Sequence, residues 1–147
     1  MNKTIFQKLF LILLPVAAVG LATTANSVTV FDPATGVTTI GSYFDLIPEA
    51  GNCQILPPLA ACLAVVNVVT AILYMVYGSA GYLKGILWVG LISACASALP
   101  IALNRSIMVL PNVVLPILMC IHAGLAFMMG KNPQEKKPNT GRRLEKH

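Results

Sequence analysis

The side chains able to do chemistry in this chain are few, and their spacing argues against a metal or redox centre. Cys120 and His122 stand two residues apart, so on a helix their side chains point about 200° apart around the axis. A zinc ion needs its ligands on one side. The four cysteines include no C-x-x-C pair, the spacing typical of a dithiol redox couple. A bridge between Cys53 and Cys62 would require the loop to fold back over the start of a helix. We expect no metal, no cofactor, and mostly free, buried thiols.

Catalytic chemistry is disfavoured because the usual groups do not stand together. The long apolar stretches contain no Asp or Glu to carry protons, and the sequence has no glycine-rich phosphate loop. Neither His122 nor His147 has a plausible nucleophile and carboxylate beside it. We therefore predict no enzymatic activity and no catalytic residues.

One group of polar residues shares a single depth. Counted at about 1.5 Å per residue from each predicted helix start, these residues fall within roughly one turn of the bilayer centre. The candidate midplane cluster is Asn67, Ser93, Ser97 and His122, with Cys95 and Cys120 nearby. The side of the second helix expected to face the bundle interior carries Asn67, Thr70, Tyr74 and Tyr77. Two interpretations stay open: a polar cavity that binds a ligand, and hydrogen bonds between packed helices, each contributing about 0.5–2 kcal/mol.

Four apolar runs are the elements that must position these residues. They span about residues 5–22, 57–77, 82–103 and 111–129. Each holds roughly the 20 residues that an α-helix needs to cross a hydrocarbon core of about 30 Å. The chain is 56% hydrophobic and only 10% charged, with a mean hydropathy of +0.78. We predict an all-α membrane protein, an antiparallel bundle of four transmembrane helices, with one membrane domain over residues 1–130.

The long outer loop, residues 23–56, begins with strand character. Two runs rich in β-branched and aromatic residues flank Asp32, Pro33 and Gly36, which have turn chemistry. We therefore predict a small extracytoplasmic β-hairpin over residues 27–40.

Two other segments are expected to support that hairpin. A lone hairpin is only marginally stable, and residues 106–110 would extend it to a three-stranded sheet. Residues 41–56 are expected to return to the bilayer as a short interfacial helix or a coil that covers the outer end of the bundle.

Basic residues near the helix ends set the predicted orientation. Six of the ten basic residues follow Gly130, and Lys3, Lys8 and Lys84 fall on the same side of a four-helix bundle. The chain is thus expected to be a multi-pass protein of a bacterial cell membrane, with both termini cytoplasmic. Residues 131–147 form a disordered basic tail that attracts anionic membrane lipids. No nucleic acid partner is implied, because this charge follows a membrane helix.

The first apolar run also fits a cleavable secretory signal. Lys3 and Lys8 lie at its start, and small residues surround Ala25. We expect the first helix to be retained, whereas cleavage would leave three helices.

Small residues and prolines define the expected helix contacts. The turn at residues 78–81 is short enough to make the second and third helices antiparallel neighbours. Gly81 and Gly85 begin a small-residue face that we expect to be a packing seam within the chain, with self-association as the alternative. Pro15, Pro100 and Pro116 each free a backbone carbonyl that needs a neighbouring donor.

The order of these elements resembles that of claudin-type tetraspan proteins. The shared layout is one helix, a long hairpin-bearing outer loop, a tightly joined helix pair, a short outer loop and a basic tail. It covers nearly the whole chain, but the claudin signature of a Trp, a Gly-Leu-Trp and two cysteines in the first outer loop is absent. Residues 42–46 (SYFDL) and 58–61 (PLAA) also resemble the outer-loop exit of small uncharacterised four-helix membrane proteins of bacteria. Neither resemblance implies an activity.

The main functional hypothesis is a non-enzymatic interaction or assembly module. It presents the hairpin to a membrane protein partner or to a second copy of itself, through Val28, Val30, Val37 and Ile40. The alternative is a small transporter, channel subunit or lipid-binding protein that uses the midplane cluster.

Overall fold

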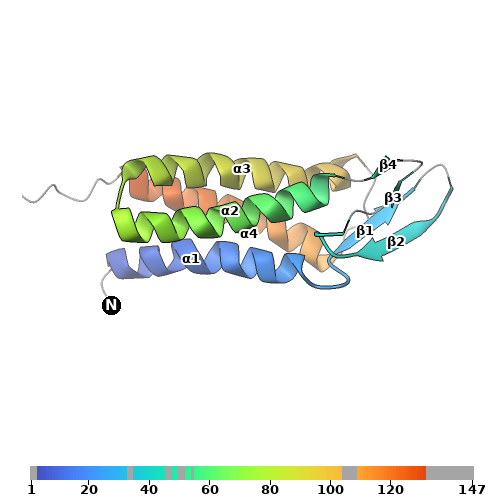
Figure 1. The fold of residues 1–147 in the computed structure, drawn as a ribbon, viewed down its shortest axis with the longest axis horizontal. Helices are drawn as coiled ribbons and strands as arrows, with labels where there is room; N and C mark the ends of the chain where they lie inside the picture. Colours follow the sequence, from blue (N-terminus) through green and yellow to red (C-terminus); the bar gives the residue numbers. More distant parts are fainter. Residues whose placement is uncertain are drawn as a thin grey trace, which may run out of the picture.

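The computed structural model describes residues 3–32, 35–45, 48–49, 52–53, 55–103 and 109–131. Within these residues the chain forms four α-helices and two small antiparallel strand pairs. The helices are α1 (Lys3–Ala22), α2 (Leu56–Tyr77), α3 (Ala80–Ala102) and α4 (Leu110–Lys131). The start of α1, the α2–α3 turn and the end of α4 lie at one end, here called the inner end (Figure 1). The strands lie at the opposite, outer end.

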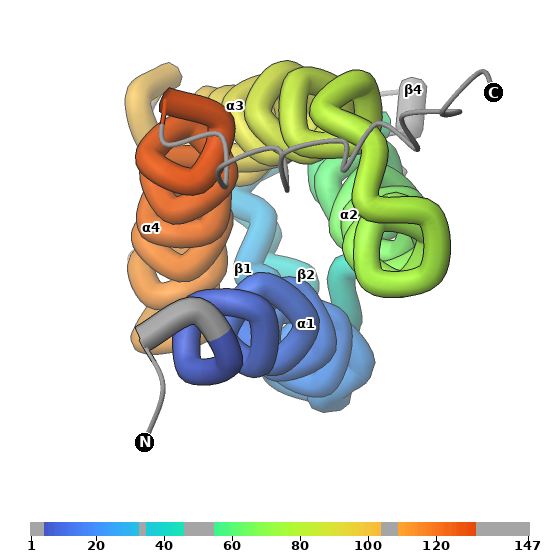
Figure 2. The backbone as a smooth tube through the Cα atoms, turned by 90° about the vertical axis from the view of Figure 1, so that its left-hand side faces the viewer, coloured from blue at the N-terminus to red at the C-terminus, as the bar shows by residue number. Residues whose placement is uncertain are grey.

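The helices run alternately in opposite directions and each lies beside two others. Figure 2 shows α1 and α3 each between α2 and α4. The seams of α3 with α2 and α4 are more extensive than the seams of α1. Over the described residues, the predicted layout of four helices and a small hairpin is confirmed.

Local sequence explains where α2 ends and α3 begins. Gly78 adopts a left-handed φ of 66° and donates its N–H to the Tyr74 carbonyl at 2.8 Å, which closes α2. Ser79 caps α3, because its side chain accepts a hydrogen bond from the Gly81 N–H. Only Gly78 and Ser79 therefore separate the two helices.

The helices place small side chains inside and large apolar ones outside. The buried positions are dominated by alanine, whereas many Leu, Ile, Val and Phe side chains are exposed. The exposed set includes Leu9, Leu13, Val65, Val69, Ile92, Ile117 and Ile121. Helices of 20 to 23 residues are about 30–35 Å long. All four helices of the described residues are thus long and apolar enough to span a membrane.

The small-residue face of α3 serves two different seams. A Cβ added at Gly85 would lie 3.7 Å from the Thr70 side chain of α2. A Cβ added at Gly90 would lie 3.3 Å from the Ala123 Cβ and 3.5 Å from the Met119 carbonyl, both on α4. Packing within the chain therefore uses this face, and the two glycines point to different neighbours.

The hairpin joins β1 (Val28–Phe31) to β2 (Thr38–Gly41) in antiparallel register, with Val28 opposite Gly41. At its turn the Asp32 N–H bonds to the Val37 carbonyl, and the Gly36 N–H bonds to the Asp32 carbonyl. Gly36 has a φ of 69°, a conformation that glycine adopts without steric cost.

The segment after the hairpin differs from the prediction of a helix or coil. Its described residues include β3 (Pro48–Glu49) and β4 (Asn52–Cys53), which pair with each other. The predicted third strand at 106–110 is wrong at Leu110, which begins α4 because Pro111 suits a helix first turn. Residues 106–108 lie outside the described part, as do residues 132–147 of the predicted tail. Lys131, placed in that tail by the prediction, ends α4.

Candidate functional site

All four side chains of the predicted midplane cluster are buried. Asn67, Ser93, Ser97 and His122 are each at most 2% exposed. Cys95 and Cys120, expected beside them as buried thiols, are free and exposed, as is Cys62. The prediction of buried thiols is therefore wrong for these three, and the side chain of Cys53 lies outside the described part.

Asn67 and Ser93 connect α2 with α3. In the amide orientation that satisfies both polar atoms, Asn67 Nδ2 donates to the Ile86 carbonyl at 3.3 Å and Oδ1 accepts from the Gly90 N–H at 3.2 Å. Ser93 Oγ donates to the Ala60 carbonyl at 2.9 Å. These bonds cross the same seam, so their first effect is to hold α2 against α3.

His122 connects α4 with α1 through a carbonyl that a proline has left without its helical donor. Pro15 has no N–H to give to the Leu11 carbonyl four residues earlier. His122 Nε2 lies 2.9 Å from that carbonyl oxygen. Because a carbonyl only accepts, Nε2 must carry the proton. The buried Nδ1 has no hydrogen-bond partner among the described residues.

The four midplane side chains do not form one joint site. Ser97 Oγ bonds within its own helix, to the Ala94 carbonyl at 2.9 Å. None of the hydrogen bonds found among the described residues joins two of the four side chains to each other. In the same part of the chain, no three His, Cys, Asp or Glu side chains are placed to hold a metal ion.

The side of α2 that was predicted to face the bundle interior is fully buried only at Asn67. Thr70 and Tyr74 are half-buried, and Tyr77 is exposed. Ten residues turn a helix through about 1,000°, which leaves Tyr77 roughly 80° away from the direction of Asn67. At the inner end Tyr77 instead stacks with Tyr82 of α3, with ring centroids 6.1 Å apart.

At the outer end the hairpin has one largely buried strand, β1, and one more exposed strand, β2. Val28 and Val30 are each 2% exposed and pack with Ala18, Ala22 and Tyr43. On β2, Ile40 is 59% exposed, and Val37 just before it is 56% exposed. Of the four residues predicted to contact a partner, Val28 and Val30 therefore pack against the bundle, whereas Val37 and Ile40 are exposed.

A short hydrogen-bonded junction fixes the hairpin to α1. Ser27 Oγ donates to the Ala22 carbonyl at 3.2 Å and lies 3.1 Å from the Tyr43 nitrogen, whose N–H also reaches the Ala22 carbonyl at 3.1 Å. Through these hydrogen bonds the outer end of α1 sets the position of the sheet. Burial at this junction also raises the pKa of the Tyr43 hydroxyl above its ordinary value, because the phenolate is poorly solvated there.

Three exposed apolar side chains at the outer end, Val37, Ile40 and Phe44, are here called the presented residues. The β-branched and aromatic residues predicted both strands but did not show which side chains the bundle covers. The signal available was the residue type at β2, where Thr38 and Thr39 make that strand the more polar of the two.

No protein-family model matches this chain, and neither the curated proteins nor the solved structures show a significant match to it.

Proposed function

We propose that this chain is a non-enzymatic, multi-pass membrane protein whose hairpin docks a protein partner outside the bilayer. Membrane insertion is supported by the exposed Leu, Ile, Val and Phe side chains along the helices. A water-soluble monomer rarely exposes an apolar surface of more than a few hundred Å². In a bilayer the same side chains contact lipid, while the alanine-rich interior lets the helix backbones approach closely.

The two ends of the bundle differ in charge, which supports an orientation. Lys84 and Lys131 lie at the inner end, whereas Asp32 and Asp45 lie at the outer end with the hairpin. Positive charge favours the cytoplasmic side. We therefore propose that the inner end, with the start of α1 and the end of α4, faces the cytoplasm and that the hairpin lies outside.

The observation that carries the docking proposal is the contrast between β1 and β2. β1 is buried against the helices, and β2 forms the other edge of a sheet that has two strands within the described residues. Bonded and non-bonded pairs alternate in an antiparallel sheet, and Asp32 with Val37 is a bonded pair. Thr38 and Ile40 then fall in non-bonded pairs and direct their N–H and C=O groups away from β1. An extended partner segment can add to this edge.

The midplane alternative is less favoured because three of its four side chains already bond to neighbouring helices, although His122 Nδ1 has no partner among the described residues. Asn67, Ser93 and His122 each bond to the backbone of a neighbouring helix. Such bonds are a sufficient reason for polar side chains at this depth.

The test replaces the presented side chains and leaves the buried ones untouched. We expect Val37→Asn with Ile40→Asn to remove the partner, or the second copy, seen by native mass spectrometry of the gently extracted full chain. The matched control is Ala25→Asn, an exposed position on the same side. Thr38→Pro deletes one edge N–H and should also abolish docking, because the lost donor is not used by β1. An unchanged complex in the double variant, with the helices folded, would refute the proposal.

A further inference from the structure

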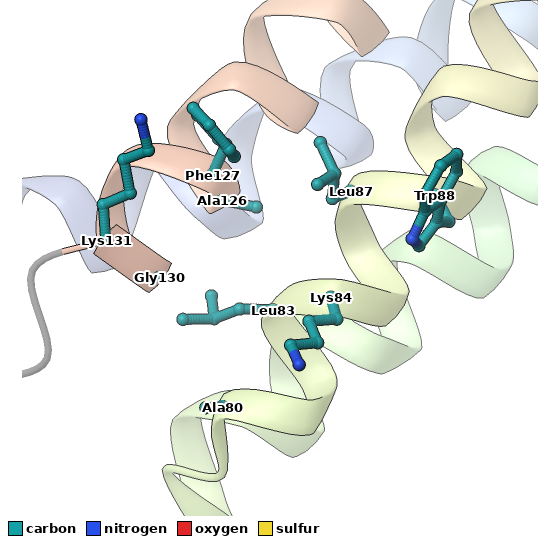
Figure 3. A pocket seen from close by; sticks show the side chains of 9 residues that line it. All are labelled: Ala80, Leu83, Lys84, Leu87, Trp88, Ala126, Phe127, Gly130 and Lys131. Atoms are coloured by element: carbon teal, nitrogen blue, oxygen red, sulfur yellow. The ribbon is translucent and has the colours of Figure 1, made fainter.

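A groove between the inner ends of α3 and α4 has no role in the hairpin proposal (Figure 3). It encloses about 430 Å³. Small-molecule sites commonly hold roughly 300–1,000 Å³. Leu83 and Leu87 of α3 and Phe127 of α4 supply apolar lining. The groove is therefore large enough for part of a lipid molecule and chemically suited to an acyl chain.

Two lysines from different helices border this apolar groove. Lys84 belongs to the second turn of α3 and Lys131 to the last turn of α4, and both are exposed. Lys131 Nζ lies 4.5 Å from the centroid of the Phe127 ring, a cation–π contact, and has no ion pair within the described residues. Within the described residues, the carboxylates Asp32 and Asp45 lie at the opposite end of the bundle.

The length of the groove matches a ligand that is charged at one end and apolar along the rest. From Ala80 at the start of α3 to Trp88, both lining residues, the helix rises about 12 Å. The lysines border the groove near the inner end of the bundle, and Trp88 is the lining residue of α3 that lies farthest from that end. An anion without an apolar part would leave the half-buried Leu87 and the exposed Phe127 ring uncovered, whereas Leu83 is already buried at the base of the groove.

We propose that this groove binds an anionic phospholipid of the inner leaflet. One acyl chain lies between α3 and α4 along Leu87, Trp88 and Phe127, and the phosphate lies at the inner end of the groove, attracted by the charges of Lys84 and Lys131 on its two borders. The occupant follows from charge complementarity, because the bordering charges are positive and the lining is apolar. The inference rests on the membrane placement proposed above and is independent of the hairpin partner.

Trp88 makes this site directly measurable, because it is the single tryptophan of the chain. The full chain is reconstituted in phosphatidylcholine vesicles in which phosphatidylglycerol or phosphatidylcholine with brominated acyl chains is titrated over the same range of mole fractions. We expect the brominated phosphatidylglycerol to quench Trp88 fluorescence at a mole fraction lower by on the order of tenfold, given the effect of two lysines.

Two variants separate charge from shape. Lys84→Gln with Lys131→Gln should remove the preference for phosphatidylglycerol. Lys8→Gln, the matched control on α1 at the same end, should retain it because Lys8 does not line the groove. Gly130→Leu adds a side chain where a Cβ meets no atom within 4 Å, at a lining position. It should weaken quenching by the anionic lipid without changing any charge.

Each outcome decides a different point. Equal quenching by the two lipids, or a preference that survives in the double lysine variant, would overturn the lipid site while leaving membrane insertion intact. Absence of quenching by either lipid would overturn the membrane placement itself. Soluble glycerol phosphate should not compete, and competition by it would show a site for a free phosphate anion instead.

Discussion

The α2–α3 seam and the α4–α1 seam are both crossed by buried polar side chains, but the two seams use them differently. Asn67 bonds to the Ile86 carbonyl and the Gly90 N–H, which are also the i and i+4 partners of one helical hydrogen bond in α3. His122 bonds to the Leu11 carbonyl, whose helical donor is missing because residue 15 is proline.

The difference shows that the number of hydrogen bonds does not rank their contributions. Without the Asn67 amide, both backbone groups keep their bond to each other. Without the His122 imidazole, a buried carbonyl between helices loses its donor, and an unsatisfied buried group costs about 1–3 kcal/mol. The single bond of His122 at α4–α1 should therefore matter more than the two bonds of Asn67 at α2–α3.

The largest loss of stability should come from replacing Gly90, whose missing side chain lets α3 lie close to α4. A Cβ there would lie 3.3 Å from the Ala123 Cβ, so Gly90→Leu must push α4 away and move His122 with it. We expect a loss of about 3 kcal/mol, near the upper end of overpacking effects. Denaturant titration of the detergent-solubilised chain measures it. Gly124→Leu, where a Cβ meets no atom within 4 Å, is the matched control on α4 and should cost little.

The comparison itself is tested by removing the donor at α4–α1. His122→Leu should lower the free energy of unfolding by about 1–2 kcal/mol, because the Leu11 carbonyl then lacks a donor within the bundle. His122→Gln keeps an N–H that can reach the carbonyl and should recover part of the loss. Equal stability of the Leu variant and the natural chain would contradict the role assigned to His122.

Proline supplies a sharper version of the same test. Pro15→Ala gives residue 15 an N–H for the Leu11 carbonyl, so His122→Leu should cost less in that background, by about 1 kcal/mol. The readout is the coupling energy of the double-mutant cycle between positions 15 and 122. Additive effects would mean that the histidine and the proline act independently.

The smallest loss of stability should come from removing the Asn67 hydrogen bonds between α2 and α3. Asn67→Leu has a similar volume, and the Ile86 carbonyl and Gly90 N–H remain bonded within α3, so we expect a loss below about 1 kcal/mol. The same denaturant titration applies. A cost above that of His122→Leu would reverse the order of the two seams and show that Asn67 does more than join α2 to α3.

Much of the fold follows from local signals. The apolar runs predicted at 57–77 and 82–103 correspond to α2 and α3 because Pro57, Pro58, Gly78 and Ser79 mark helix ends through backbone chemistry. The hairpin likewise follows from turn residues between β-branched runs. These features depend on neighbours within a few positions, which the sequence displays directly.

The direction in which each helix side chain points could not be read in the same way. A helix that is apolar all round gives no periodic signal for its inward face. Cys95 and Cys120 were expected inside with His122, yet they face outward. In the outer loop, the sequence predicted two strands without showing that the bundle covers β1 and leaves Ile40 of β2 exposed.

The sequence by itself determined the helix lengths, the tight α2–α3 turn, the hairpin and the unequal distribution of charge, because each depends on composition and local chemistry. Only the tertiary structure decided that His122 serves the Leu11 carbonyl, 111 positions away along the chain. It also decided which hairpin residues are presented and which lysines border the groove. Such pairings depend on the rotation and packing of whole helices, which small differences in side-chain volume control.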